Sequence, residues 1–188
     1  MNLQISGYRF KWLVLMLAVL TLTACGWRLR GSVSLPEQIQ KINLIQLADY
    51  GGFNKRLIKA LESAGAEVVE SKVGADVSIS VIKIDLDKKS AAVDSQGRTI
   101  AQDISLNLIY SLQDNEGNIL AEQEDMRQSR IYRFDPDNVL AMEREESRVV
   151  SGLIDEMVAA LISRVKHQVK SQANSHPKSK IKPKARQE

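Results

Sequence analysis

The sequence predicts an α+β fold in which two helices pack on one face of a mixed, mainly antiparallel sheet of four to five strands. Two segments carry apolar residues at the three- and four-residue spacing of amphipathic helices. Several other segments alternate apolar and polar residues, as half-buried strands do. The predicted order of elements is β, α, β, β, β, β, α, and this order is typical of a two-layer α+β sandwich.

The first half of the domain is predicted to contain a strand, a helix and a short second strand. Residues 39–47 hold an apolar run that is too short for a helix and suits a strand. After a turn at 49–52, Phe53, Leu57 and Leu61 fall at helical spacing, and Gly65 stands where a helix C-cap is expected. Residues 66–69 follow as the next strand, which predicts a crossover onto one sheet.

The middle of the chain is predicted to be rich in strands. Apolar residues in 75–86 alternate up to Val81 and change phase at Ile82, which implies a β-bulge or a stretch covered on both faces. From Ile100 the alternation is clean, and one face of this strand carries Ile104, Leu106, Leu108, Tyr110 and Leu112. Because apolar and polar residues alternate, we expect this strand to lie on a core with its other face in water. Residues 114–117, which follow it, have the composition of a hairpin turn.

The strand predicted at 118–134 carries many charges, which favours an edge strand or a solvated surface, and a long two-stranded ribbon is expected to project beyond the core. Arg127, Arg130 and Arg133 are three residues apart, so a strand would place them on alternating faces and not in one patch.

The last element is predicted to be a long amphipathic helix that begins after the capping segment 135–138. Its apolar stripe consists of Val149, Val150, Leu153, Ile154, Met157, Val158, Leu161, Ile162 and Val165. Beyond Lys170 the chain loses apolar residues and gains Pro177 and Pro183, so residues 171–188 are predicted to be a disordered basic tail. Residues 25–170 form the predicted domain.

The charge of the chain is unevenly distributed. The whole sequence has a formal net charge of +3, but residues 25–170 hold 19 basic and 22 acidic residues. The predicted folded domain is therefore acidic, and this charge balance excludes nucleic acid as its partner. The single cysteine also excludes an internal disulfide, so the stability of the domain must come from packing.

Residues 1–24 have the features of a signal peptide. Arg9 and Lys11 precede an uncharged run of eleven residues from Trp12 to Leu22. This run is shorter than the roughly 20 apolar residues of a membrane-spanning helix and fits a signal-peptide core. The alternative is a buried structural cysteine that follows an uncleaved anchor.

The segment Leu22-Thr23-Ala24-Cys25 resembles the lipobox of bacterial lipoproteins at every position. The resemblance implies that Cys25 is acylated and becomes the first residue of the mature chain. Two or more acyl chains hold a protein durably on a bilayer. In lipoproteins of the enterobacterial type, Asp after the cysteine favours the inner membrane. The residue here is Gly26. The resemblance therefore implies a lipid anchor in the outer membrane, on the periplasmic side.

The sequence contains no constellation suited to catalysis, cofactor binding or a metal site. Its two histidines, His167 and His176, lie at the end of the last predicted helix and in the tail. Phosphate-binding loops, dinucleotide fingerprints and nucleophile elbows are absent from the sequence. The acidic pair Asp85 and Asp87, and the Glu143, Glu145 and Glu146 group, fit a solvated strand end and a helix N-terminus better than an acid–base pair. We infer a protein that is not an enzyme.

Basic residues are the better candidates for ligand contact. Lys88 and Lys89 follow the strand predicted to end at Leu86, and Arg98 lies in the turn 94–98. One end of the sheet is therefore expected to carry positive charge near two turns. Arginine and lysine there offer the donors that bind the phosphates of an acidic amphiphile. The alternative for each residue is a solvated loop.

Several features together resemble the LptE family of outer-membrane lipoproteins that act in lipopolysaccharide transport. They are the lipobox, the opening 25–31, the pair Leu35-Pro36, the order of elements, the Gly97 turn, the segment 130–132 and the Glu145-Glu146 pair. The resemblance covers about residues 22–165. It implies a domain that sits in the lumen of an LptD-type β-barrel, helps that barrel to assemble and binds lipopolysaccharide.

The same resemblance places ligand-binding basic residues in the turn before the clean strand and near the start of the last helix. Arg98 and Arg144 occupy these places, with Met142 as the alternative at the helix position. The predicted ligand-binding set is therefore Lys88, Lys89, Arg98 and Arg144. The competing function is a periplasm-facing outer-membrane lipoprotein that binds peptidoglycan or another envelope protein.

Overall fold

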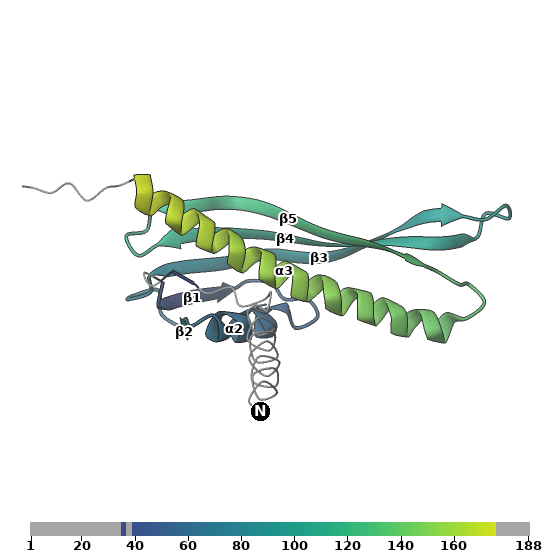
Figure 1. The fold of residues 1–188 in the computed structure, drawn as a ribbon, viewed down its shortest axis with the longest axis horizontal. Helices are drawn as coiled ribbons and strands as arrows, with labels where there is room; N and C mark the ends of the chain where they lie inside the picture. The colour runs from purple at the N-terminus through teal and green to yellow at the C-terminus, as the bar shows by residue number, and fades with distance from the viewer. Residues whose placement is uncertain (1–34, 37–38, 176–188) are drawn as a thin grey trace, which may run out of the picture. The chain divides into compact units, whose positions relative to one another are not determined.

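The computed structural model describes residues 35–36 and 39–175, with side chains up to residue 171. The elements are β1 (Lys41–Gln46), α2 (Phe53–Ser63), β2 (Glu67–Val69), β3 (Val77–Val93), β4 (Thr99–Asp114), β5 (Ile119–Arg133) and α3 (Val139–Ser175) (Figure 1). This order confirms the predicted one.

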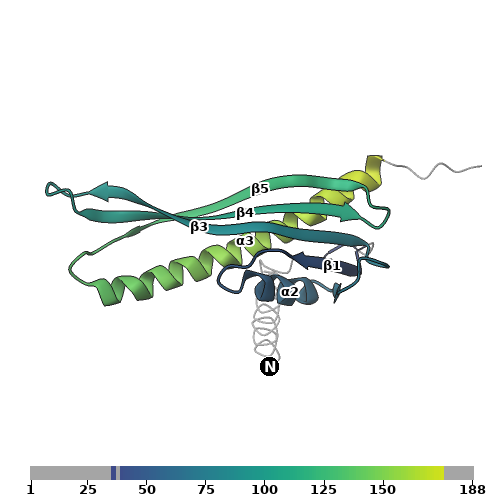
Figure 2. The same cartoon turned by 180° about the vertical axis from the view of Figure 1, so that it is seen from behind.

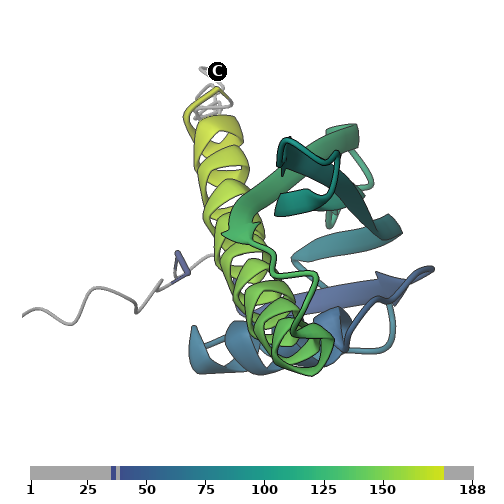
Figure 3. The same ribbon diagram turned by 90° about the vertical axis from the view of Figure 1, so that its right-hand side faces the viewer.

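The five strands form one mixed sheet in the order β2-β1-β3-β4-β5. The short strand β1 pairs in parallel with β2 and with β3, whereas the β3–β4 and β4–β5 pairs are antiparallel. Both helices lie on one side of the sheet, as the end-on view in Figure 3 shows. The predicted α+β architecture is confirmed, and the charged strand β5 is an edge strand as expected.

The core lies between the sheet and the two helices. The five apolar residues predicted to share one face of β4 are all buried. They pack with Phe53, Leu57 and Leu61 of α2, which are buried, and with the apolar stripe of α3, in which every residue except the partly exposed Val150 is buried. Arg56 of α2 fixes the helices to each other, because its Nη1 lies 2.7 Å from Asp155 Oδ1 and 3.1 Å from the carbonyl oxygen of Ser151 on α3.

The change of phase in β3 is a β-bulge, which is one of the two alternatives that the sequence left open. Val81 pairs with Tyr110, but the next pair is Lys83 with Ile109, so Ile82 is the extra residue. The bulge returns the following apolar residues to the core, because Ile84 pairs with Leu108 on the helix-covered side.

The strand predicted to end at Leu86 continues to Val93, and this prediction of its end was wrong. Beyond Leu86 the residues of β3 keep their backbone pairing with β4, as in the pair of Ser90 with Gln102. The β3–β4 pair therefore forms the ribbon that extends past the core, with the turn 94–98 at its tip (Figures 1 and 2). Residues 88–93 are exposed, so they lack the apolar alternation from which the sequence could have revealed the extension.

The domain has a distal end and a proximal end. The distal end comprises the turn 94–98, the loop 134–138 and the first turns of α3. The proximal end comprises the turn 114–117, the first residues of β1, β2 and β3, and the last turns of α3.

The helix α3 takes in residues 171–175 of the predicted tail, and the remaining tail lies outside the described residues. None of the helices in the described part of the chain is long and apolar enough to cross a membrane.

The loop before α2 supplies a test of the contact between the two helices. Gly51 has a φ of +57°, and a Cβ at this position would lie 2.7 Å from Ile154 Cδ1 on α3. Gly51→Ala is expected to lower the free energy of unfolding by about 2–4 kcal/mol, because overpacking adds to backbone strain. Gly52 has a φ of +75° with open space around it, so Gly52→Ala is the matched control and should cost only about 1–2 kcal/mol. Equal losses in urea titrations of the two variants would contradict the close approach.

Candidate functional site

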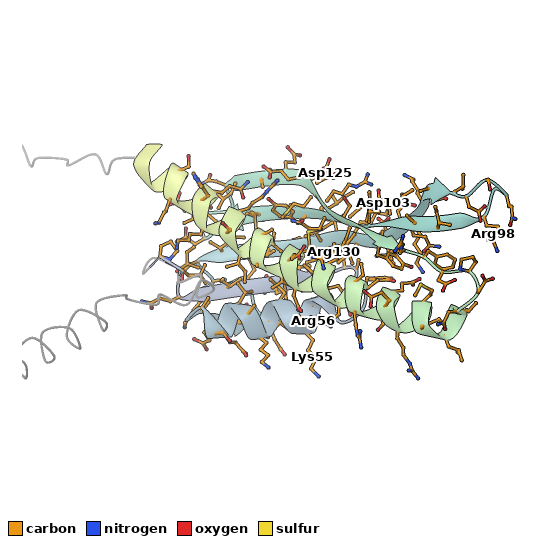
Figure 4. The ribbon with its side chains drawn as sticks, turned by 45° about the vertical axis from the view of Figure 1, so that its right-hand side comes forward. Lys55, Arg56, Arg98, Asp103, Asp125 and Arg130 are labelled. Atoms are coloured by element: carbon orange, nitrogen blue, oxygen red, sulfur yellow. The ribbon has the colours of Figure 1, made fainter. Side chains whose placement is uncertain are left out.

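The tip of the ribbon is a turn organised by one carboxylate. Asp94 Oδ1 accepts hydrogen bonds from the backbone N–H groups of Gln96 and Arg98, both at 2.9 Å, and Asp94 Oδ2 accepts one from Arg98 Nε at 2.8 Å. The hydrogen bonds from the backbone and side chain of Arg98 hold the pKa of Asp94 below its usual value. Arg98 Nη1 also lies 3.8 Å from Asp137 Oδ1, so the tip faces the loop that leads into α3 (Figure 4).

Lys88 and Lys89 lie within β3 and not at a strand end, which corrects their predicted place. Adjacent residues of a strand point to opposite faces. Lys88 points to the helix-covered side and forms an ion pair with Glu146 of α3. Lys89 points to the other side, where its Nζ lies 2.8 Å from Asp87 Oδ2. The two lysines therefore do not belong to one cluster.

The first turns of α3 bring Arg144 and Met142 to the distal end. Arg144 is exposed and forms no ion pair within the described residues. The Met142 sulfur accepts a hydrogen bond from the backbone N–H of Asp135 at 3.2 Å, so this side chain closes the loop before the helix. The structure thus gives Met142 a local role and leaves Arg144 open to solvent.

Next to these residues, polar contacts join β4 to β5 and the ribbon to α3. The hydroxyl of Tyr132 on β5 donates a hydrogen bond to Gln102 Oε1 on β4 at 2.8 Å. Burial, followed by the negative charge of Glu146, raises the pKa of Tyr132. Because Glu146 also pairs with Lys88, the ribbon and the helix are joined by a charged contact whose two side chains stay partly exposed to solvent.

Exposed apolar side chains also gather at the distal end, and the sequence analysis missed them. Val93 and Ile100 flank the ribbon tip, and Val139 and Leu140 begin α3; all four are between 41% and 74% exposed. They are exposed because the ribbon and the start of α3 diverge here (Figure 1). The adjacent Val139 and Leu140 were the only sequence signal, since they precede the buried stripe. Cations and apolar groups together suit an amphiphile with an acidic head.

The remaining predicted residues do not join this group. Cys25 lies outside the described residues. Arg130 forms an ion pair with Glu156 on α3, whereas Arg127 Nη2 lies 3.8 Å from Asp103 Oδ2 on the opposite face of the sheet. This confirms that the spaced arginines do not form one patch. Within residues 35–36 and 39–175, no group of His, Cys, Asp and Glu side chains could hold a metal ion.

A second polar cluster joins β4, β5 and α3 nearer the proximal end. The hydroxyl of buried Tyr110 donates to Glu124 Oε2 at 2.9 Å, and Gln168 Nε2 donates to Glu124 Oε1 at 2.9 Å. Arg164 Nη1 lies 3.4 Å from the same carboxylate. Burial, followed by the hydrogen bond to Glu124, raises the pKa of Tyr110 to about 12.

This raised pKa predicts a loss of stability at high pH. Between pH 10 and about 12, the unfolded chain releases the Tyr110 proton while the folded protein keeps it, so the free energy of unfolding falls as pH rises. Between pH 9.5 and 11.5, the free energy of unfolding of the unsubstituted protein is expected to fall by about 2 kcal/mol more than that of Tyr110→Phe, because phenylalanine has no proton to release. Denaturant titrations at both pH values measure this difference. The same loss in both proteins would contradict the prediction.

Comparison with known proteins gives one family. The family model for LptE, described as lipopolysaccharide-assembly, matches residues 40–165. A curated relative, the LPS-assembly lipoprotein LptE of Pectobacterium atrosepticum, is 28% identical over 102 residues. That match covers 54% of this chain and 55% of the relative, so it spans about half the length of the relative.

Solved structures share the fold. Lipoprotein B of Nitrosomonas europaea aligns with a TM-score of 0.66 at 20% identity, covering 80% of this chain and 97% of that one. The rare lipoprotein B of Shewanella oneidensis aligns with a TM-score of 0.55 at 17% identity, covering 73% of this chain and 96% of that one. At these identities the two alignments establish the fold alone.

Proposed function

The chain belongs to the LptE family of lipopolysaccharide-assembly lipoproteins, and from this premise we propose that it assembles lipopolysaccharide into the outer leaflet of the outer membrane together with an LptD-type β-barrel. The observation that carries the proposal is the family match over residues 40–165, which includes nearly the whole described fold. The family is a non-catalytic one, so the chain is not an enzyme.

Within this function, the domain serves as plug and assembly factor for the barrel. The sheet face away from α2 and α3 supports this role, because it carries ion pairs such as Lys83 with Asp85 and Arg127 with Asp103 and no helix of the described residues covers it (Figure 2). A polar, uncovered face suits the polar lumen of a barrel. The edge strand β5 is also heavily charged, which protects a free edge against indiscriminate strand pairing.

The distal end is the proposed lipopolysaccharide-binding site. Arg98 and Arg144 provide cations at the tip and on α3, and Lys88 lies behind them in its pair with Glu146. The exposed apolar residues Val139 and Leu140 would meet the acyl part of the ligand. Lys89 faces the other side of the sheet, so it would contact a different part of the ligand or the barrel wall.

The anchor in this proposal is acylated Cys25, which tethers the domain to the periplasmic side of the outer membrane. The lipoprotein character of the family is consistent with such an anchor. In this arrangement residues 1–24 are the cleaved signal peptide.

Photocrosslinking tests the partners directly. A crosslinking amino acid at position 98 or 144 is expected to capture lipopolysaccharide or the barrel in cells. The matched control is position 55, where Lys55 projects from the outer side of α2 (Figure 4). Crosslinks at 55 but at neither distal position would contradict the placement of the ligand site.

Extraction in mild detergent tests the partnership itself, since the protein is expected to co-purify with a large β-barrel. Extraction as a lone monomer from cells that express both proteins would favour the periplasm-facing lipoprotein that binds peptidoglycan or another envelope protein.

A further inference from the structure

A small apolar patch interrupts the otherwise polar face of the sheet, on the side away from α2 and α3. Leu47 follows β1, and its backbone N–H donates to the carbonyl oxygen of Val81 at 3.1 Å, so it lies beside Ile82 of β3. The β-bulge in β3 sets Ile82 opposite Ile109 of β4. Ile45 lies next to Leu47 on the same face, because alternate residues of a strand share a face. We call Ile45, Leu47, Ile82 and Ile109 the cross-strand patch.

Packing of the domain itself does not account for the cross-strand patch. The side chains at its β1 end are open to solvent, since Ile45 is 37% and Leu47 is 67% exposed. Ile82 and Ile109 are partly exposed and belong neither to the core nor to the side chains packed against it. An apolar patch rimmed by polar residues is typical of a protein–protein contact. The patch therefore indicates a surface that a partner covers.

Beside the patch, one carboxylate has no ionic partner within the described residues. Lys83 is already paired, because its Nζ lies 3.1 Å from Asp85 Oδ1. Asp125 of β5 is exposed and pairs across the strands with Ile109, and its side chain extends away from the helices (Figure 4). No residue of the described part of the chain forms an ion pair with Asp125. A partner with an arginine or lysine at this place would therefore meet an unpaired carboxylate.

The curvature of the sheet limits what can cover the patch. The sheet bends around the helices, so the face that carries the patch is convex (Figure 3). A partner helix docks in a groove, and a convex face offers none. The inner wall of a β-barrel is concave, and alternate residues of its strands point into the lumen. The convex sheet face and a concave barrel wall are therefore complementary in shape.

We propose that the cross-strand patch and Asp125 form the centre of the contact between this domain and the inner wall of the partner barrel. The proposal rests on the barrel partnership of the proposed function. The wall presents apolar side chains to the patch and an arginine or lysine to Asp125. The row from Leu47 to Asp125 crosses four strands, or about 14 Å, which a few neighbouring strands of the barrel can cover. Because a few central residues carry most of the binding energy of an interface, the patch determines how tightly the barrel holds the domain.

Acidic substitutions inside and outside the patch test its contribution. Leu47→Asp places a charge in the patch and is expected to lower the amount of barrel that co-purifies with the full-length protein in mild detergent about tenfold. Val73→Asp is the matched control, because Val73 is an exposed apolar residue in the turn before β3, outside the patch. It is expected to leave the amount of barrel unchanged. Equal amounts of barrel with the two variants would overturn the proposal.

Charge reversal tests the carboxylate beside the patch. Asp125→Lys is expected to lower the amount of co-purified barrel about tenfold. Glu62→Lys makes the same change at an exposed position of α2 and is expected to leave the amount unchanged. Urea titrations of the four purified variants are expected to give the midpoint of the unsubstituted protein, because all four positions are exposed. A loss of barrel with Glu62→Lys as large as with Asp125→Lys would overturn the proposal.

Photocrosslinking in cells identifies what covers the patch. It does not depend on a disruptive variant, because an apolar crosslinking amino acid replaces Ile109 conservatively. Position 109 is expected to capture a strand of the barrel. Capture of a second copy of this chain, of lipopolysaccharide or of another segment of the same chain would overturn the proposal. Purification of the unsubstituted protein without any barrel would instead contradict the proposed function, so the two failures are distinguishable.

Discussion

Replacing Cys25 with alanine is expected to abolish acylation and to lower the amount of the protein in the outer membrane strongly. The thiol is the only one in the chain, so no other side chain can take the acyl group. The loss of two or more acyl chains removes the durable part of the membrane attachment, because the uncharged run Trp12–Leu22 is too short to replace them with a stable spanning helix. Intact mass spectrometry and membrane fractionation measure the two consequences.

A second variant separates acylation from sorting. Gly26→Asp leaves the thiol in place, so it is expected to keep the acyl mass and to shift the protein toward the inner membrane. Recovery of the Cys25→Ala protein in the outer-membrane fraction at the native level would contradict the anchor. The full acyl mass on Gly26→Asp with unchanged location would contradict only the sorting rule.

Replacing Phe53 with alanine is expected to lower the free energy of unfolding by about 3–5 kcal/mol. Phe53 is the first residue of α2 and is fully buried. A helix of 11 residues is marginal by itself, so α2 depends on the apolar side chains that join it to the core. The loss is a large part of the roughly 5–15 kcal/mol that stabilises a typical domain.

Two controls accompany this variant in denaturant titrations. Lys55→Ala changes the exposed side of the same helix and is expected to shift the free energy of unfolding by no more than about 0.5 kcal/mol. Phe53→Leu keeps most of the apolar volume and is expected to lose less than Phe53→Ala. A loss below about 1 kcal/mol in Phe53→Ala would show that α2 is not held by this side chain.

The distal end shows how much of the candidate site could be predicted from the local sequence. The turn at 94–98 was predictable, because Asp94 and Gly97 have the chemistry of a tight turn and place Arg98 at its end. The family resemblance was also correct, and its confirmation comes from residues 40–165. The opening 25–31, on which the resemblance most depended, lies outside that range and outside the described residues. The sites of lipid and ligand contact therefore stay predictions.

The sequence by itself determined the order of helices and strands and which of their faces are buried, and it indicated a change of phase in 75–86 that left a β-bulge and a stretch covered on both faces as alternatives. It could do so because burial leaves a repeating apolar pattern in the chain. Only the tertiary structure decided that β3 continues to Val93, that Lys88 and Lys89 face opposite sides, and that Glu146 is the partner of Lys88. The physical reason is that an exposed stretch of strand carries no burial pattern, and its partners come from residues far away in the chain, brought together by strand register and helix packing.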